Sequence, residues 1–196
     1  MKNDRFSLAL VLLLAVCAVT AYADKTMGTS IGQVVANFKL PDVEGREQTL
    51  ESIKGKNGTV IIFISAQCPM VKAYAERIEK LAQDYRGRGV NVVGINSNAT
   101  ESIDYIKQQI AEEKFSFVIL KDRNNKIADM LGAERTPEAY FLDASNKLVY
   151  HGRIDNHKNL SLVQANDLRD AIDATLAGKP VVKTEAAAFG CSIKRG

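Results

Sequence analysis

The residues best placed for chemistry are Cys68 and Pro69, at the junction of an apolar run and an amphipathic segment. The run Val60–Ile64 is rich in β-branched residues, which predicts a strand buried on both faces of a parallel sheet. From Val71 to Tyr85, apolar residues recur at three- and four-residue steps and predict a helix. Proline fits the first turn of a helix, because its missing N–H would have no partner there. Cys68 is therefore expected at a helix N-terminus and at the carboxyl end of a central strand.

This position favours a reactive thiol. Unpaired N–H groups and the helix dipole stabilise an anion there by a fraction of a kcal/mol up to about 2 kcal/mol. Since a thiolate is such an anion, the pKa of Cys68 is expected to be lowered, which makes it a better nucleophile near neutral pH. The alternative for a lone thiol is a buried, inert cysteine. The proline and the strand-to-helix junction favour the redox interpretation.

The first 23 residues are predicted to be a cleaved export signal. Lys2 and Arg5 provide a basic start, residues 8–19 are apolar, and residues 21–23 form a small-x-small cleavage site. The apolar stretch is short for a membrane span. The mature chain is expected to begin at about Asp24, in the periplasm or outside the cell.

Three cysteines occur in the chain, and the first lies inside the predicted signal. Residues 14–17 roughly resemble a lipobox, but Val16 directly before Cys17 fits that motif poorly, so a lipoprotein is the less favoured alternative. Removal of the signal leaves Cys68 and Cys191. Two cysteines in an oxidising compartment form either a structural disulfide or a catalytic pair.

Further elements must position Cys68. The apolar run Val90–Ile95 predicts a second buried strand, which completes a βαβ unit with a right-handed crossover. Polar residues 96–100 then lie at the carboxyl edge, where open α/β sheets bind ligands, and a helix follows with Thr100 or Ser102 as its cap. The other expected elements are an edge strand before Pro41, a strand at 115–120, a short helix at 126–131, a hairpin ending in strand 147–151, and a helix at about 160–177.

Two further segments are informative. Pro137 is expected at the first position of a strand, because proline cannot donate to the sheet ladder, and the Thr136–Pro137 bond is open to either isomer. The tail, residues 181–196, is weakly patterned and is expected to be mobile. A cysteine in such a tail gains little from packing, so a resolving or bridging role is expected for Cys191.

In this order, the elements resemble the thioredoxin fold over about residues 31–179. A helix–strand–helix segment at 101–131 looks like the insertion of peroxiredoxins and periplasmic thiol-disulfide oxidoreductases. The closest resemblance is to exported, peroxiredoxin-like members of the alkyl hydroperoxide reductase and thiol-specific antioxidant group. It implies an α/β domain over 24–180, with a central mixed sheet flanked by helices. The motifs that carry it are Cys68-Pro69, Gly132-Ala133, Thr136-Pro137, Gly152-Arg153-Ile154-Asp155 and Gly190-Cys191-Ser192-Ile193-Lys194.

Three departures from the family patterns affect the predicted activity. Thioredoxins use Cys-x-x-Cys, but Val71 stands at the second cysteine position. Peroxiredoxins place Pro-x-x-x-Thr before the reactive cysteine, and here Ile61 and Ser65 take those positions. The arginine that peroxiredoxins place beside the cysteine aligns with Pro137, and two nearby candidates for its role are Arg135 and Arg153.

The resemblance implies an exported thiol oxidoreductase, with Cys68 as nucleophile on a peroxide or a protein disulfide. Cys191 then acts as the resolving thiol, and an external thiol reductant reopens the disulfide. No cofactor is expected. The supporting residues are expected to be Pro69, Thr136, Pro137, Ser65 and Arg135, with Tyr74 as a further neighbour.

The alternative is a thioredoxin-fold binding or structural module with a permanent Cys68–Cys191 bridge. Other partners are not indicated: the net charge is only +3, so neither nucleic acid nor an anionic membrane is expected. His151 and His157 raise the possibility of a copper site. However, copper chaperones with this fold need a second cysteine near the first, so no metal site is expected.

Overall fold

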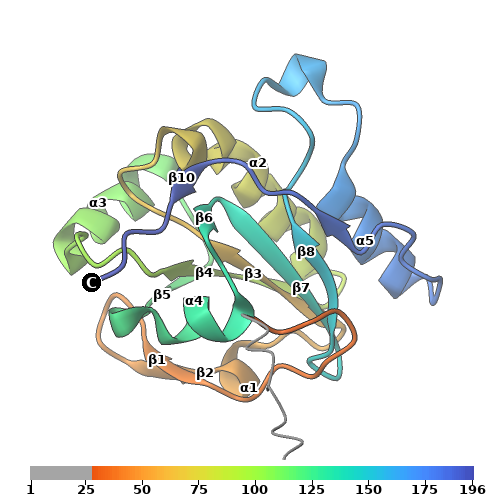
Figure 1. Ribbon diagram of the computed structural model, residues 1–196, viewed down its shortest axis with the longest axis horizontal. Coiled ribbons are helices and arrows are strands. Elements are labelled where there is room, and N and C mark those ends of the chain that lie inside the picture. Colours follow the sequence, from red (N-terminus) through yellow and green to blue (C-terminus); the bar gives the residue numbers. More distant parts are fainter. Residues whose placement is uncertain (1–27) are drawn as a thin grey trace, which may run out of the picture.

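The computed structural model describes residues 28–196 and centres on β3 (Gly58–Phe63), whose six residues are all buried (Figure 1). The sheet that contains β3 has the order β5-β4-β3-β7-β8-β9. β4 and β5 run parallel to β3, whereas β7 is antiparallel to it. The flanking strands are β4 (Val90–Asn96), β5 (Val118–Lys121), β7 (Glu138–Asp143), β8 (Leu148–Gly152) and β9 (Glu185–Ala186).

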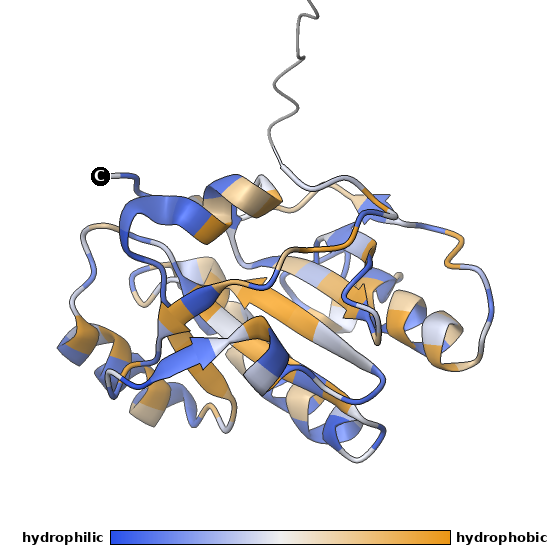
Figure 2. Ribbon diagram, turned by 90° about the horizontal axis from the view of Figure 1, so that it is seen from below, coloured by the Kyte–Doolittle hydropathy of each residue, from blue (hydrophilic) through white to orange (hydrophobic). Residues whose placement is uncertain are grey.

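Alternate residues of β3 feed two hydrophobic cores, one on each face of the sheet. Val60 and Ile62 pack with the first core, whereas Ile61 and Phe63 pack with the second. Figure 2 shows the hydrophobic residues concentrated in the central strands. The first core is covered by three helices, α2 (Pro69–Arg86), α3 (Ile103–Glu113) and α5 (Asp167–Leu176). The second core is covered by α1 (Leu50–Ile53), α4 (Lys126–Leu131) and the hairpin of β1 (Lys39–Pro41) and β2 (Glu47–Thr49).

The predicted mixed sheet flanked by helices is thus confirmed, as is the helix–strand–helix insertion of α3, β5 and α4. Ser102, one of the two predicted caps, accepts a hydrogen bond from the N–H of Tyr105. α4 ends at Gly132, as expected for a residue in the left-handed region. No helix within residues 28–196 is long and apolar enough to cross a membrane. The predicted signal, residues 1–23, lies outside the described part.

The prediction of one continuous helix at about 160–177 was wrong, because the first part of this range is not α-helical. Leu160–Leu162 form only a 3-10 turn, η2, with Leu160 and Leu162 exposed, and α5 begins at Asp167. The intervening backbone is held by a side chain, because Asn156 Oδ1 accepts hydrogen bonds from the N–H groups of Gln164 and Ala165. Asparagine competes for backbone groups in this way and thereby disfavours a continuous helix.

The expectation of a mobile tail was also wrong for this state of the protein. β9 pairs in parallel with β8, and β10 (Cys191–Ser192) pairs antiparallel with β6 (Arg135–Thr136). Ile193 is buried in the second core. Figure 1 shows the tail in dark blue, crossing from α5 past β6 to its end near α3. Long-range pairing of this kind leaves little trace in the local sequence pattern.

The burial of Ile193 yields a stability prediction. Ile193→Ala removes a side chain that is 7% exposed, so the free energy of unfolding of the oxidised protein should fall by about 2–4 kcal/mol. The matched control is Val182→Ala in the same tail, where the side chain is fully exposed and little change is expected. Urea unfolding measures both, and equal values for the two variants would mean that the tail does not pack as described.

Candidate active site: a disulfide at the start of a helix

Cys68 directly precedes α2, with Pro69 as the first helical residue, as predicted. Its side chain is 3% exposed, and its backbone N–H donates to the carbonyl of Ser65 at 3.3 Å. Cys68 forms a disulfide with Cys191, 123 residues away in sequence, with 5.9 Å between the Cα atoms. The two cysteines expected to act as a pair are therefore brought together within one chain. The lowered pKa of Cys68 stays a prediction for the reduced protein, because a disulfide does not titrate.

Strand β6 presents Cys191 to Cys68. In the antiparallel pairing of β10 with β6, Cys191 lies opposite Thr136 and Ser192 opposite Arg135. The carbonyl oxygen of Thr136 lies 3.1 Å from the sulfur of Cys68. The peptide bond between Thr136 and Pro137 is cis. Thus Thr136 contacts both cysteine segments, and its supporting role beside Cys68 stays a prediction.

The approach of the tail to β6 requires glycine at position 190. A Cβ atom added to Gly190 would collide with the carbonyl oxygen of Thr136 and lie 2.8 Å from its carbonyl carbon. The φ angle of Gly190 is +155°, which side chains rarely adopt. The glycine directly before Cys191 therefore allows the two backbones to meet.

A buried carboxylate, Glu138, fixes the backbone in front of the cis bond. Its Oε2 atom accepts hydrogen bonds from the N–H groups of Glu134 and Arg135, at 2.9 and 2.8 Å. Its Oε1 atom lies 2.6 Å from Nε2 of His151 and accepts from Tyr140 at 3.2 Å. Burial raises the pKa of Glu138, but hydrogen bonds from His151 and the two backbone N–H groups outweigh burial and lower it.

A second buried carboxylate, Glu101, holds the loop in front of Cys68. Oε1 accepts hydrogen bonds from Oγ of Ser65 at 2.5 Å and from the N–H of Gln67 at 3.2 Å. Oε2 accepts from the N–H of Ala66 at 2.9 Å and from Nδ2 of Asn96 at 2.5 Å. The sequence interpretation missed both Glu101 and Glu138. The available signal for Glu101 was its place after the polar run at the carboxyl edge of a parallel strand.

Some expected site residues lie elsewhere. The hydroxyl of Ser65 is bound to Glu101, so it does not take the role of the peroxiredoxin threonine in this state. Arg153 forms an ion pair with the buried Asp167, at 2.6 Å. Arg135 is exposed and extends to the carbonyl of Gly190, at 3.4 Å. The side chain of Arg135 therefore reaches Gly190, next to Cys191, whereas Arg153 meets the tail only through its backbone N–H, which donates to the carbonyl of Ala186 at 3.1 Å.

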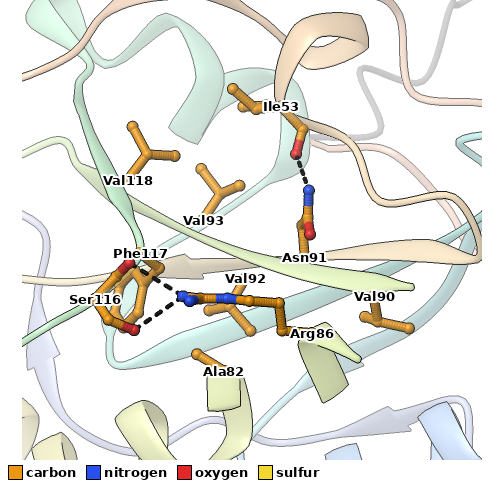
Figure 3. A pocket seen from close by; sticks show the side chains of 10 residues that line it. All are labelled: Ile53, Ala82, Arg86, Val90, Asn91, Val92, Val93, Ser116, Phe117 and Val118. Carbon is orange, nitrogen blue, oxygen red and sulfur yellow. Dashed lines mark hydrogen bonds between the residues drawn. The ribbon is translucent and has the colours of Figure 1, made fainter. Parts of the chain in front are cut away.

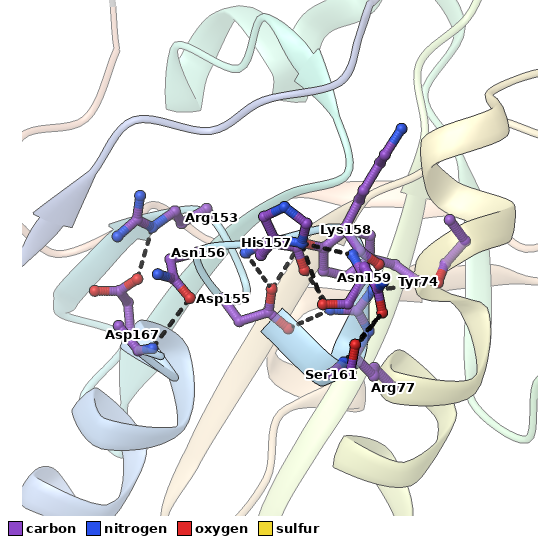
Figure 4. Close-up of polar contacts among 12 residues, drawn as sticks. Tyr74, Arg77, Arg153, Asp155, Asn156, His157, Lys158, Asn159, Ser161 and Asp167 are labelled. Carbon is purple, nitrogen blue, oxygen red and sulfur yellow. Dashed lines mark hydrogen bonds and ion pairs between the residues drawn. The ribbon is translucent and has the colours of Figure 1, made fainter. Parts of the chain in front are cut away.

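Tyr74 connects the tail with the loop that follows β8. Its ring contacts Phe189 edge-on at 6.2 Å between centroids, and its hydroxyl donates to Asp155 at 2.7 Å. Arg77 stacks on the same ring and pairs with Asp155 at 2.6 Å (Figure 4). Burial and then the bond to Asp155 raise the pKa of Tyr74, so its hydroxyl remains a donor at neutral pH.

Other features of residues 28–196 lie apart from the cysteines. A pocket at the amino ends of β4 and β5, the opposite edge from Cys68, is lined in part by Arg86, which donates to Ser116 (Figure 3). In this part of the chain, no group of three or more His, Cys, Asp or Glu side chains is arranged to hold a metal ion. His151 is paired with Glu138, and His157 contacts Asn159.

A mixed sheet, a cysteine at a helix N-terminus and a cis-proline beside it define a redoxin of the thioredoxin-like fold. The chain belongs to the AhpC/TSA family, whose model matches residues 31–151. This confirms the resemblance drawn from the sequence. The family assignment rests on most of the sheet together with the segment that carries Cys68.

Several known proteins are similar. The thiol-disulfide oxidoreductase ResA of Halalkalibacterium halodurans is 25% identical over 155 residues, covering 76% of this chain and 86% of ResA. The crystal structure of a hypothetical protein from Sinorhizobium meliloti is 36% identical, with a TM-score of 0.79 over 86% of this chain and 96% of that protein. An uncharacterised conserved protein from Geobacillus kaustophilus is 34% identical, with a TM-score of 0.79 over 85% and 93% of the two chains.

The glycine contact predicts the effect of Gly190→Ala. The added methyl group forces β10 away from Thr136, so the Cys68–Cys191 disulfide should become roughly tenfold easier to reduce, given a typical overpacking cost. Equilibration with glutathione measures this change. Gly45→Ala is the control, because Gly45 also has positive φ but no atom lies within 4 Å of the added Cβ. If the disulfide becomes easier to reduce by the same factor in both variants, the cause is backbone strain rather than the contact with Thr136.

The lowered pKa of Glu138 predicts a pH-dependent loss of stability in Glu138→Gln. An acid whose pKa is lowered by folding stabilises the protein above its ordinary pKa, and this stabilisation disappears as the pH falls through the folded-state value. The variant should be destabilised by about 1–3 kcal/mol at about pH 6 and by less at about pH 3, below the ordinary pKa of a glutamate. Urea unfolding at both pH values, with the exposed Glu134→Gln as control, makes the comparison. A pH-independent difference would contradict it.

Proposed function

We propose that this protein is an exported thiol-disulfide oxidoreductase, with Cys68 as nucleophile and Cys191 of the same chain as resolving thiol. The observation that carries the proposal is the disulfide between a cysteine that directly precedes a helix and a cysteine on a tail strand paired beside Thr136. The family match and the ResA relatives support this class of reaction. Residues 1–23 are proposed as the signal, 24–180 as the redoxin domain and 181–196 as the tail that carries Cys191.

The reaction proceeds by two thiolate attacks. In the reduced protein, the thiolate of Cys68 attacks a disulfide of the partner, which forms a mixed disulfide and releases one partner thiolate. The thiolate of Cys191 then attacks the sulfur of Cys68, which breaks the mixed disulfide and releases the second partner thiolate. Two electrons pass to the partner, and the chain ends with the Cys68–Cys191 disulfide. An external dithiol reverses these steps and restores the reduced protein.

Backbone contacts explain how Cys191 reaches the mixed disulfide. The carbonyl of Thr136 lies 3.1 Å from the Cys68 sulfur, and the backbone of Thr136 is paired with Cys191. In the oxidised protein the tail occupies this edge of β6, so a partner gains access to it only after reduction frees Cys191. Pro69 begins the helix whose N-terminus favours the Cys68 thiolate.

The contacts favour a protein disulfide over a peroxide as substrate. Peroxide reduction by peroxiredoxins relies on a hydroxyl and an arginine beside the thiolate. Here the hydroxyl of Ser65 donates to Glu101, and the guanidinium of Arg153 is bound to Asp167. Peroxide remains the second substrate to test, because the family includes peroxide-reducing proteins and Arg135 lies beside the tail.

A permanent bridge is the alternative function. Its supporting observation is the burial of Ile193, which fastens the tail to the second core. A structural disulfide has a potential below about −300 mV and resists reduction by glutathione, whereas an exchange site is reduced readily.

Exchange activity distinguishes these functions. The reduced mature protein should reduce a scrambled protein disulfide, and Cys68→Ser should abolish the activity. Cys191→Ser should trap a mixed disulfide at Cys68, which mass spectrometry detects. The same three proteins are mixed rapidly with hydrogen peroxide. Oxidation of Cys68 much faster than that of a free thiol would identify peroxide as the substrate. Inactivity in both assays would support the permanent structural bridge.

A further inference from the structure

A buried polar network lies beneath the disulfide and connects both cysteine segments to one loop. This loop, Asn96–Glu101, joins β4 to the helix cap of α3. Four of its residues are at most 4% exposed: Asn96, Ser97, Asn98 and Glu101. Burial of this many polar groups carries a free-energy cost unless each finds a partner, so the partners indicate what the loop does.

Toward Cys68, the partner is the turn that precedes it. Glu101 accepts hydrogen bonds from the N–H groups of Ala66 and Gln67 and from the Ser65 hydroxyl. Its carboxylate is thus bonded to the residue next to Cys68. Gln109 adds a bond from its Nε2 to the carbonyl of Ser65, at 3.2 Å. Both the N–H groups and the carbonyl of this turn are therefore bonded, which fixes the position of Cys68 directly before α2.

Toward Cys191, the partner is the backbone of the tail. Oδ1 of Asn98 accepts a hydrogen bond from the N–H of Lys194 at 2.7 Å, and the N–H of Ala99 donates to the carbonyl of Lys194 at 2.8 Å. Lys194 is three residues beyond Cys191. Both bonds use the backbone of Lys194, and its side chain is exposed.

The two halves of the network meet at a buried cation. Nζ of Lys121 donates to Oδ1 of Asn96 at 2.9 Å and to the carbonyl of Asn98 at 2.6 Å. Nδ2 of Asn96 in turn donates to Glu101. Hydrogen bonds therefore run from the turn before Cys68, through Glu101, Asn96, Lys121 and Asn98, to the tail beyond Cys191.

We propose that the Asn96–Glu101 loop positions both cysteines, with Glu101 fixing Cys68 and Asn98 holding the tail so that Cys191 stays close to it. Asn98 thereby raises the effective concentration of Cys191 at Cys68, which sets how readily the disulfide forms. The carboxylate of Glu101 accepts from the N–H of Gln67, the residue next to Cys68. Its negative charge therefore opposes the helix dipole at the Cys68 thiolate, and Lys121, on the other side of Asn96, offsets part of that charge. The two positioning residues have separable effects: Asn98 acts on the disulfide equilibrium alone, whereas Glu101 acts on the thiol as well.

The test is the equilibrium between the purified protein and glutathione, in which the disulfide and two glutathione thiols exchange with the dithiol and glutathione disulfide. Asn98→Ala removes the acceptor of the Lys194 N–H, so the disulfide should become about fivefold easier to reduce, the value of one hydrogen bond. Lys194→Ala is the matched control, because both backbone bonds persist, and it should stay within about twofold of the native protein. An Asn98→Ala value equal to that of the control overturns the assignment.

Two further variants protect the test against simple misfolding. Asn98→Asp keeps an oxygen acceptor for the Lys194 N–H and exchanges Nδ2, which has no partner among residues 28–196, for a carboxylate oxygen. The charge-assisted bond should restore the equilibrium to within about twofold. Glu101→Gln should lower the pKa of the Cys68 thiol, measured by the pH dependence of alkylation in a Cys191→Ser background, because a like charge is removed. Asn98→Ala should leave that pKa unchanged. An unchanged pKa in Glu101→Gln, or failure of Asn98→Asp to restore the equilibrium, would contradict the proposal.

This inference rests on the proposed redox role of Cys68 and Cys191, yet its measurement needs no turnover. If the native protein shows no exchange activity but Asn98→Ala and Lys194→Ala still differ in their glutathione equilibria as predicted, the proposed function alone is rejected. Normal exchange activity together with identical equilibria in Asn98→Ala and Lys194→Ala would reject the positioning role alone.

Discussion

The covalent link between Cys68 and Cys191 joins two segments that are 123 residues apart, and the rest of the site depends on it. In the chain-entropy model, closing a loop of this length stabilises the folded state by roughly 4–5 kcal/mol. The link also places β10 against β6, so that Gly190, Cys191 and Thr136 share one backbone contact. Reduction removes the covalent part of this arrangement and leaves non-covalent contacts. These are strand pairing, the burial of Ile193, the Tyr74–Phe189 ring contact, the bonds of Lys194 to Asn98 and Ala99, and the ion pairs Lys183–Asp167 and Arg195–Asp129. The tail is thus held by weak interactions in just the state that must admit a partner.

Two buried carboxylates support the site from opposite sides, and they do so by the same means. Glu101 bonds the N–H groups of Ala66 and Gln67 before Cys68, and Glu138 bonds those of Glu134 and Arg135 before Thr136. A carboxylate that accepts several such bonds offsets the cost of its own burial. Glu101 fixes a turn outside the sheet, whereas Glu138 fixes the backbone at the start of β6, which also pairs with β10 of the tail. The sulfur of Cys68 and the carbonyl of Thr136 meet between these two fixed stretches.

The same contacts bear on the choice between the two chemistries found among redoxins. Activating a peroxide requires a hydroxyl and a cation that are free to face the thiolate. Ser65 and Arg153 are both engaged with buried carboxylates, whereas backbone pairing at Thr136 suits an extended polypeptide. This distribution of polar contacts supports the proposed exchange with a protein disulfide rather than the reduction of a peroxide.

The sequence by itself determined the central βαβ unit and the position of Cys68 between a buried strand and the start of a helix. A β-branched apolar run, a proline and a helical period are local signals, and local signals specify local structure. It also indicated the mixed sheet, the insertion and the importance of Thr136 and Pro137. Tertiary structure alone decided the rest. The tail has no periodic pattern, so its pairing with β6 and β8 and the burial of Ile193 followed only from surfaces that the folded domain offers. Glu101, Glu138 and Asn98 were likewise hidden, because isolated polar residues take on their role only when distant backbone N–H groups converge on them.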